Sequence, residues 1–307
     1  MQRYIVVRFL QSLLALFLLS VVIFLLARAT GDPLHLLLPM QATPEDFANA
    51  RQVLGLDRPL PYQYWVFISK AVRGDFGMSI RARKPVAELL AERLPNSAKL
   101  AGFAMAVSIL FAFPLGVISA VYKGTRVDTA AKVMAVLGQS LPAFWVGIVL
   151  VEVVAGRWQI LPAGGTGELT HYVLPGFTLG WFVVAGIMRL LRSSMLDVLD
   201  SEFVKMARLK GVRERWVIWK HALRNALIPV ATFGAIYFSI LVTTAIVVET
   251  VFAWPGMGRL TYEAITSRDF PVIQAVVLST ALIVIVVNLG VDILYAYLDP
   301  RIRYGTR

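Results

Sequence analysis

The sequence predicts an all-α integral membrane protein with six transmembrane helices. Of its 307 residues, 58% are hydrophobic and only 16% are charged, and the mean hydropathy is +0.69. Soluble domains carry about 25% charged residues. A helix needs about 20 apolar residues to cross ~30 Å of hydrocarbon. Six segments meet or approach that length, at 9–29, 100–122, 131–154, 173–191, 227–248 and 272–298.

The distribution of basic residues predicts the orientation of these spans. Six spans place both termini on one side, and short loops rich in Lys and Arg stay in the cytoplasm. The short segments on the side of the termini carry 17 Lys and Arg, whereas the opposite short loops carry Arg157, Arg259 and Arg268. We therefore expect both termini in the cytoplasm.

The spans divide the chain into four parts. Residues 1–29 form the N-terminus and first span, and 30–98 form a folded external loop, long enough to escape the charge rule. Residues 99–298 hold the remaining spans, including a polar segment at 193–226, and 299–307 form a cytoplasmic tail. A cleaved signal peptide is the alternative for the first span, because Ala27-Arg28-Ala29 resembles a cleavage site. Signal-peptide apolar regions are only 7–15 residues long, which favours a retained helix.

Few residues inside the predicted spans are polar or break helices. Pro114 and Pro142 each remove a backbone hydrogen bond, so we expect kinks there. Glu152 and Asp292 are the acids within the spans. Each is interpreted either as an interfacial group that reaches water or as part of a transport path.

Several kinds of chemistry are absent from the sequence. There is no Cys, and only three His residues occur, which leaves little for a metal site. No Gly-Lys pair occurs, so a phosphate-binding loop for ATP is excluded. The sequence lacks the His-Glu-x-x-His and Gly-x-Ser-x-Gly motifs of hydrolases. Three classes stay open: a transporter whose energy comes from a partner protein, an ion-coupled secondary transporter and a membrane-embedded hydrolase.

The segment at 193–229 is too polar to span and too regular to be a linker. Its apolar residues recur at spacings of three and four, which predicts one helical stripe. The stripe consists of Leu196, Leu199, Phe203, Met206 and Leu209. Asp200 or Ser201 is expected to cap the helix start, and Glu202 lies in the first turn.

Gly211 is expected to end this helix, because a glycine in the C′ position takes positive φ readily. A second helix is predicted from Glu214, carrying Trp216, Trp219 and His221. Periodicity alone leaves three interpretations open. A basic amphipathic helix can dock on lipid or on a partner protein. The segment can also be a solvated connector.

The residues at 203–211, FVKMARLKG, followed by HALRNALIP at 221–229, resemble the permease coupling motif of ABC importers. The match is to the dipeptide/oligopeptide/nickel, glutathione-type family, and to the first permease of its pair. Further similar segments cover the rest of the chain. They are LGLDRPLP at 54–61, RGDFG at 73–77, LLRSSM at 190–195, VETVFAWPGMG at 248–258 and LDPRIR at 298–303.

Two departures limit what the resemblance carries over. The Glu-Ala-Ala triplet of the broader family falls on Lys205, Met206 and Ala207, where only the alanine is kept, and a later proline is replaced near Arg224. Both changes are usual in the peptide branch. No role is therefore assigned to a coupling glutamate.

The resemblance implies a type I ABC importer permease architecture, a place in a bacterial inner membrane, and a set of partners. These are a second homologous permease subunit, two ABC ATPase subunits that bind the ATP, a periplasmic substrate-binding protein and the lipid bilayer. Catalytic, metal and cofactor sites are not expected, and neither is nucleic acid. Peptides or similar small solutes would cross by alternating access. The residues implied to couple to the ATPases are Lys205, Met206, Ala207, Arg208, Gly211, His221, Arg224 and Asn225.

A second candidate site follows the fifth span. Glu249, Trp254, Pro255 and Gly256 form a segment whose composition is typical of an irregular turn at the outer interface. The resemblance places it near the external gate, whereas a Trp at that depth also serves as an aromatic membrane anchor. In the external loop, aromatic and basic residues either meet the binding protein or form a structural cap. They are Trp65, Phe67, Phe76, Arg81, Arg83 and Lys84.

Overall fold

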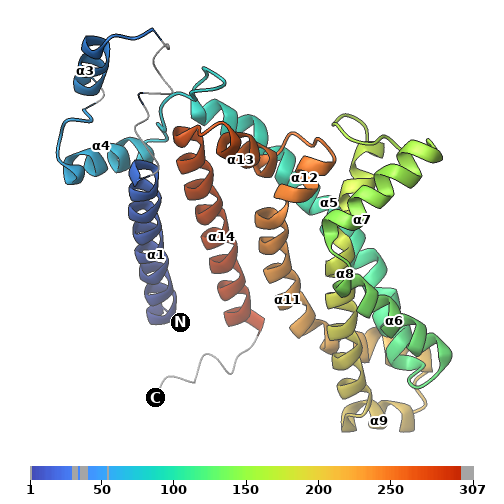
Figure 1. Cartoon of the computed structure of the whole chain (residues 1–307). Helices are drawn as coiled ribbons and strands as arrows, with labels where there is room; N and C mark the ends of the chain where they lie inside the picture. Colours follow the sequence, from blue (N-terminus) through green and yellow to red (C-terminus); the bar gives the residue numbers. More distant parts are fainter. Residues whose placement is uncertain (1, 30–33, 35–40, 54, 299–307) are drawn as a thin grey trace. The chain divides into compact units, whose positions relative to one another are not determined.

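The predicted all-α class is confirmed by the computed structural model (Figure 1). It describes the backbone of residues 2–29, 34, 41–53 and 55–298, and the side chains of these residues except 2–5, 239, 242–244 and 291–298. Apart from an isolated bridge between Met78 and Pro85, the regular structure of the described residues is helical. The chain forms two compact units. Unit 1 is Met1–Asn96 with Gly256–Val286, and unit 2 is Ser97–Pro255 with Val287–Arg307.

Unit 1 holds the helices that begin the chain and two that come late in it. They are α1 (Gln2–Ala29), α3 (Pro44–Val53), α4 (Leu60–Val72), α13 (Met257–Thr266), the first part of α5 (Val86–Val121) and most of α14 (Phe270–Leu298). Helices α1 and α4 meet through aromatic rings, with the centroids of Phe24 and Phe67 5.7 Å apart. A second apolar cluster joins α5, α13 and α14 around Val86, Leu260 and Val272.

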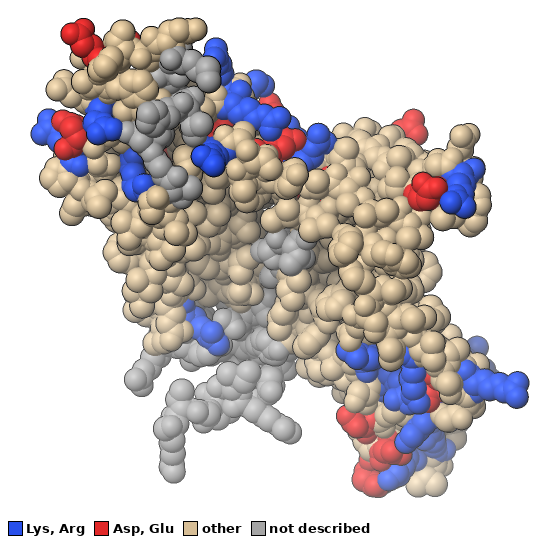
Figure 2. Space-filling model, viewed as in Figure 1, with Lys and Arg blue, Asp and Glu red and all other residues tan. Residues whose placement is uncertain are grey.

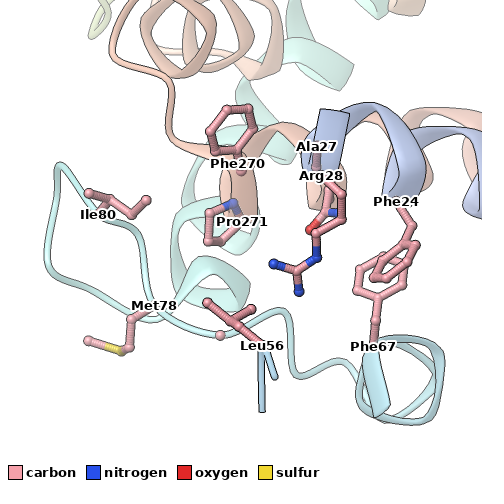
Figure 3. Close-up of a pocket in the computed structure, with 11 residues that line it drawn as sticks. Phe24, Ala27, Arg28, Leu56, Phe67, Met78, Ile80, Phe270 and Pro271 are labelled. Atoms are coloured by element: carbon pink, nitrogen blue, oxygen red, sulfur yellow. The ribbon is translucent and has the colours of Figure 1, made fainter. Parts of the chain in front are cut away.

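A mostly apolar cavity of about 390 Å³ lies inside unit 1 at the end of α1 (Figure 3). Its wall includes Phe24, Phe67, Met78 and Phe270, and the guanidinium of Arg28 points toward its centre. The Arg28 guanidinium carbon lies 5.4 Å from the ring centroid of Phe24. The segment that resembles a cleavage site is thus the last turn of a continuous helix.

Unit 2 is organised around α8. It contains the rest of α5 and α14, and the following elements: α6 (Arg126–Ser140), α7 (Ala143–Leu150), the π-helical η1 (Val151–Arg157), α8 (Thr170–Leu199), α9 (Glu202–Leu209), α10 (Glu214–Trp216), the π-helical η2 (Val217–Ala222), α11 (Leu223–Thr244) and α12 (Ile246–Val251). Helices α6, α7, α11 and α12 all contact α8. Its buried residues include Val183, Ile187, Met188 and Leu191, so α8 forms the centre of the unit's core.

Four described helices are long and apolar enough to cross a membrane: α1, α5, α8 and α14. A fifth span is possible if α6 and α7 are taken together, but these two helices meet at an angle of 100°. The kink that Pro142 predicts within 131–154 is therefore observed, as a sharp break between α6 and α7. Pro142 disfavours helical geometry in the residue before it, and Leu141 accordingly has φ −84° and ψ 125°.

Helix α11 covers most of the predicted fifth span without meeting the same test over its described residues, so six spans stay a prediction. The predicted second span, 100–122, is the C-terminal part of the 36-residue α5. A helix of that length is about 54 Å long, which exceeds the thickness of the hydrocarbon core.

Candidate functional site: the elbow and the outer turn

The polar segment after α8 forms a bent pair of short helices, which we call the elbow (residues 200–222). Helix α8 ends at Leu199 and α9 begins at Glu202. The predicted stripe is therefore split between two helices, because Ser201 has ψ 151° and interrupts them. Ser201 occupies the N-cap position, but its hydroxyl donates a 2.5 Å hydrogen bond to the Val198 carbonyl instead of capping α9. The prediction of a side-chain cap at Asp200 or Ser201 is thus wrong.

Gly211 ends α9 as predicted, with φ +75°. The Gly211 N–H donates to the Arg208 carbonyl at 3.0 Å, and the Val212 N–H donates to the Ala207 carbonyl at 3.2 Å. This pair of bonds is the Schellman motif, which satisfies carbonyls at a helix end and requires positive φ at C′. An added Cβ at Gly211 meets nothing within 4 Å. Glycine is therefore needed here for backbone conformation, not for space.

One face of α9 is packed and the opposite face is bare. Val204 is fully buried, whereas Phe203, Met206 and Leu209 are 47%, 58% and 83% exposed. Ala207 is half-buried. A fully polar face would be ordinary for an exposed helix, so three large apolar side chains at helical spacing form a surface suited to a partner.

Two ion pairs connect residues within the elbow. The Arg208 Nη2 donates to Glu214 Oε1 at 2.7 Å, and its Nε donates to Glu214 Oε2 at 3.2 Å. This two-point contact ties α9 to α10 across Gly211. The Lys205 Nζ donates to Glu202 Oε1 at 2.9 Å, and this hydrogen bond raises the pKa of the Lys205 ammonium. Arg208, which the resemblance implies couples to the ATPases, thus contacts Glu214 within the elbow.

The second half of the elbow runs without a break into α11. Its π-helical turn, η2, includes His221, and the Asn225 amide donates to the His221 carbonyl at 2.8 Å. Arg224 and Asn225 are exposed. π-helical turns carry wider hydrogen-bonded loops than α-helix and occur often at functional sites. The predicted coupling residues therefore lie on one continuous structure, although they do not converge on a single pocket.

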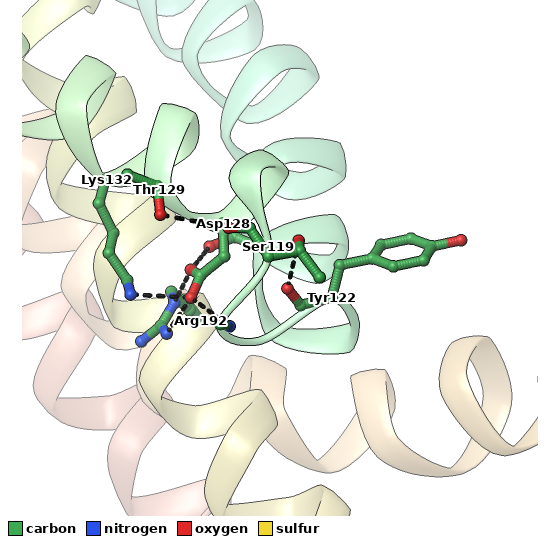
Figure 4. A network of polar contacts seen from close by, with 8 residues as sticks. Ser119, Tyr122, Asp128, Thr129, Lys132 and Arg192 are labelled. Atoms are coloured by element: carbon green, nitrogen blue, oxygen red, sulfur yellow. Dashed lines mark hydrogen bonds and ion pairs between the residues drawn. The ribbon is translucent and has the colours of Figure 1, made fainter.

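A buried carboxylate that the sequence did not reveal is Asp128, in the first turn of α6, where α6 meets the C-terminal part of α8 (Figure 4). Asp128 is fully buried and accepts two bonds from Arg192, at 2.8 Å from Nε and 3.0 Å from Nη2. It also accepts from the Ser119 hydroxyl at 2.7 Å and the Gly124 N–H at 3.0 Å, and pairs with Lys132 at 2.8 Å. This cluster ties α5, α6 and α8 together about two turns before α8 ends at Leu199. Arg192 lies in the quoted motif, but its partner is 64 residues away.

The outer turn (residues 249–256) is built very differently from the elbow. Glu249, Phe252 and Trp254 are each fully buried. The Ser97 hydroxyl donates to Glu249 Oε1 at 2.5 Å, and the rings of Tyr172 and Trp254 meet edge to face at 4.6 Å. A side chain at Gly164 would collide with the Phe252 carbonyl. Trp254 is thus part of the core of unit 2.

The outer turn spans a boundary between the two units. Pro255 is the last residue of that stretch of unit 2, and Gly256 begins the next stretch of unit 1. Gly256 has φ −112° and precedes α13 as its N-cap residue. The turn therefore brings Glu249 and Trp254 into one packed cluster of unit 2, and leaves Gly256 to start a new helix.

Other predicted residues lie apart from both sites. Glu152 is exposed in η1 and pairs with Arg157 at 3.2 Å, while the side chain of Asp292 lies outside the described residues. Trp65 is 67% exposed on α4. No three His, Asp or Glu side chains among the described residues come together as a metal site would require.

Charged side chains of unit 2 gather at its two ends (Figure 2). One group covers the α9 end of α8 and the other surrounds η1, with a band of uncharged residues between them. This distribution is typical of a protein whose middle faces hydrocarbon and whose ends face water.

Comparisons with known proteins agree with this geometry. A family model described as "Binding-protein-dependent transport system inner membrane component" matches residues 112–304. A second model, "Binding-prot-dependent transport system membrane comp, N-term", matches residues 1–101. The "Glutathione transport system permease protein GsiC" of Escherichia coli (strain K12) is 42% identical over 305 residues, covering 99% of this chain and 100% of the relative. The protein of that name from Shigella dysenteriae serotype 1 (strain Sd197) gives the same values.

Solved structures show the same fold at low identity. "Inward facing conformations of the MetNI methionine ABC transporter", in the SeMet soak crystal form, matches with a TM-score of 0.58 and 15% identity over 69% of this chain and 96% of that chain. "Crystal structure of an amino acid ABC transporter with histidines" matches with a TM-score of 0.56 and 12% identity over 68% and 94%. Both are ABC transporters, and the comparisons give no support to an ion-coupled carrier. This chain belongs to the family of inner membrane components of binding-protein-dependent transport systems, and is a permease subunit of an ABC importer.

Proposed function

We propose that this permease carries peptides or glutathione-like solutes into the cytoplasm, as the first of two homologous permease subunits. Two ABC ATPase subunits bind and hydrolyse the ATP, and a periplasmic binding protein delivers the solute. The chain itself performs no covalent chemistry and needs no cofactor. Both termini and the elbow face the cytoplasm in this proposal, which the excess of Lys and Arg in the corresponding loops supports.

The bare apolar face of α9 carries the proposal. Phe203, Met206 and Leu209 project from a helix whose other side is anchored by the buried Val204. An apolar face of this size suits a groove on another protein. Full-length identity of 42% to a glutathione permease supports the solute class.

The proposed motion passes from the elbow into α8. When ATP closes the two ATPases, each elbow moves with the ATPase groove that holds it. The Arg208–Glu214 pair keeps α9 and α10 together, and the Asp128–Arg192 cluster carries the shift of α8 to α5 and α6. Switching of this kind is rigid-body movement of packed elements between inward-open and outward-open states.

Reconstitution tests the proposal. The chain is expressed with its neighbouring permease, ATPases and binding protein, and the complex is placed in liposomes with ATP inside. We expect ATP-dependent import of glutathione or of short peptides, and binding-protein-stimulated ATP hydrolysis. Full import by the single chain without ATPases would contradict the proposal, as would an elbow accessible only from the periplasmic side.

A further inference from the structure

A second cavity meets the apolar cavity at the end of α1, and its wall is polar. It measures about 440 Å³, and all of its described lining residues belong to unit 1. The end of α3, the turn after it and α4 supply most of the wall. Arg28 and Phe67 line both cavities. An apolar cavity and a polar cavity of unit 1 thus share one cationic side chain.

The polar cavity carries three positive charges. Arg28, Arg58 and Lys70 line it, and none of the other described residues in its wall is acidic. Arg58 and Lys70 are exposed, and neither forms an ion pair within the part of the chain that the structure describes. Gln52 and Tyr62 add neutral hydrogen-bonding groups to the wall. Charge complementarity therefore favours an anionic occupant.

The apolar cavity suits a different part of the same occupant. Aromatic and aliphatic side chains make up most of its wall, among them Phe24, Phe67 and Met78. The guanidinium of Arg28 points toward its centre, so the positive charge lies beside the apolar wall (Figure 3). A molecule that fills both cavities must therefore join an anionic group to a hydrocarbon chain.

The position of the cavities along α1 identifies this molecule. The apolar span of α1 continues to Ala29, so Arg28 lies where the hydrocarbon core meets the lipid headgroups. Helix α4 contacts α1 and runs across its end (Figure 1). Its Tyr62 and Trp65 are exposed, and these two residue types are enriched at the headgroup level. The amphiphile available at that depth is a phospholipid.

We infer that unit 1 binds one anionic phospholipid at the C-terminal end of α1. Its phosphate lies beside Arg28, Arg58 and Lys70, and part of one acyl chain occupies the apolar cavity. Arginine and lysine bind phosphate through charge-assisted hydrogen bonds. Only the assignment of this lipid to the periplasmic leaflet rests on the proposed function, because it depends on the proposed orientation.

The headgroup determines which lipid is preferred. An acyl chain gains little when it moves from the bilayer into the cavity, because lipid tails are as apolar as the cavity wall. The ammonium of phosphatidylethanolamine and the choline of phosphatidylcholine are repelled by the three cations. Phosphatidylglycerol has no positive group, so we expect it to be bound in preference to both.

Native mass spectrometry of the assembled transporter tests this inference. The complex is placed in nanodiscs that contain equal amounts of phosphatidylglycerol and phosphatidylcholine with identical acyl chains. It is then released, and the lipids that stay bound are counted. Other subunits retain lipid as well, so the difference between variants of this chain reports on the site.

We expect Arg58→Gln and Lys70→Gln each to weaken phosphatidylglycerol binding about fivefold, the effect of one basic residue beside an anionic headgroup. The double variant is expected to lose one bound phosphatidylglycerol per complex and to keep the same amount of phosphatidylcholine. Arg73→Gln is the matched control. It removes an exposed arginine directly after α4 that lines neither cavity, and we expect lipid retention to stay unchanged.

Inorganic phosphate distinguishes a lipid from a free anion. In large excess it supplies the anionic group without the chain, and we expect it to leave the bound phosphatidylglycerol in place. Displacement of the lipid by phosphate or by glutathione would identify a site for soluble anions, and the inference would then be wrong.

Unchanged phosphatidylglycerol retention in the double variant would overturn the inference, and so would an equal loss of both lipids. If these substitutions weaken only the binding of the periplasmic protein, the polar cavity is a protein-docking surface and the inference also fails. Assembly of each variant is verified first, and the single substitutions decide the matter if the double variant does not assemble. Lipid retention is measured without transport, so its outcome is independent of whether the complex imports peptides.

Discussion

The elbow and the outer turn end their helices with the same hydrogen bonds but differ in the residue at positive φ. After α9 that residue is Gly211, with φ +75°, and after α12 it is Ala253, with φ +49°. In the outer turn the Ala253 N–H donates to the Thr250 carbonyl and the Trp254 N–H to the Glu249 carbonyl, again the Schellman pattern. The elbow uses the residue that adopts this conformation without strain, whereas the outer turn imposes it on an alanine.

Burial explains how the outer turn tolerates that alanine. Phe252 and Trp254 flank Ala253 and are fully buried, so their packing holds the backbone in place. The elbow has little such packing: its bare face carries Phe203, Met206 and Leu209. The comparison teaches that the outer turn is held by the chain itself, while the elbow keeps its shape through glycine and an ion pair and leaves its surface for a partner.

The largest expected effect is that of Gly211→Pro. Proline fixes φ near −65° and lacks the N–H that bonds to the Arg208 carbonyl, so the elbow cannot close. We expect solute uptake to fall to background while the amount of chain in the membrane stays normal. Uptake at the unaltered rate would discredit the role of the elbow in coupling.

Trp254→Ala is expected to act on stability. Removing a fully buried indole and its contact with Tyr172 costs about 3–5 kcal/mol. The measurement is the free energy of unfolding of the isolated permease pair in detergent, without the ATPases. Leu209→Ala is the matched control, because Leu209 is 83% exposed and its loss is expected to change that free energy by less than about 0.5 kcal/mol. Similar losses in the two variants would contradict the contrast in packing.

Replacing the three exposed apolar residues of α9 with serine tests ATPase coupling without changing a buried side chain. Phe203→Ser, Met206→Ser and Leu209→Ser together remove the surface proposed to contact the ATPase. We expect uptake and copurification of the ATPase subunits to fall by about 10-fold or more, with an unchanged melting temperature of the isolated permease pair. Normal copurification would assign the stripe to lipid instead.

The smallest expected effects come from single substitutions of the two C′ residues, Gly211 and Ala253. Gly211→Ala places a Cβ in open space but forces positive φ on an alanine, so it costs about 1 kcal/mol. Ala253→Gly relieves the same strain and is expected to stabilise by up to about 1 kcal/mol. Differential unfolding in denaturant measures both, and changes of the same sign would show that backbone strain does not distinguish the turns.

Local signals in the sequence predict some of these features well. Gly211 follows an amphipathic stretch, and its positive φ depends on residues within one turn of it. Long apolar runs predict α1, α8 and α14 because twenty consecutive residues contribute to each. The outer turn is predictable as irregular from Pro255 and Gly256, although not the burial of Trp254, which depends on Tyr172 from another helix.

Features that depend on contacts between residues far apart in the chain could not be predicted from the sequence. Asp128 and Arg192 are 64 positions apart, and each alone looks like an ordinary charge near the end of a span. Arg208 has a visible charge, but its partner Glu214 lies across the bend at Gly211. Pro142 predicts a kink, but the residue alone does not predict a bend as large as the 100° between α6 and α7, both of which pack against α8.

The π-helical turn η2 has a consequence for insertions and deletions in this family of chains. A π turn holds one residue more than the α turn it replaces. Deleting one residue within Val217–Ala222 would therefore restore a regular α-helix, and leave α11 in register with the membrane core. The same deletion would swing α10 by about 100° around the helix axis and aim α9 elsewhere. A single codon at this point is thus enough to redirect the elbow without disturbing the spans.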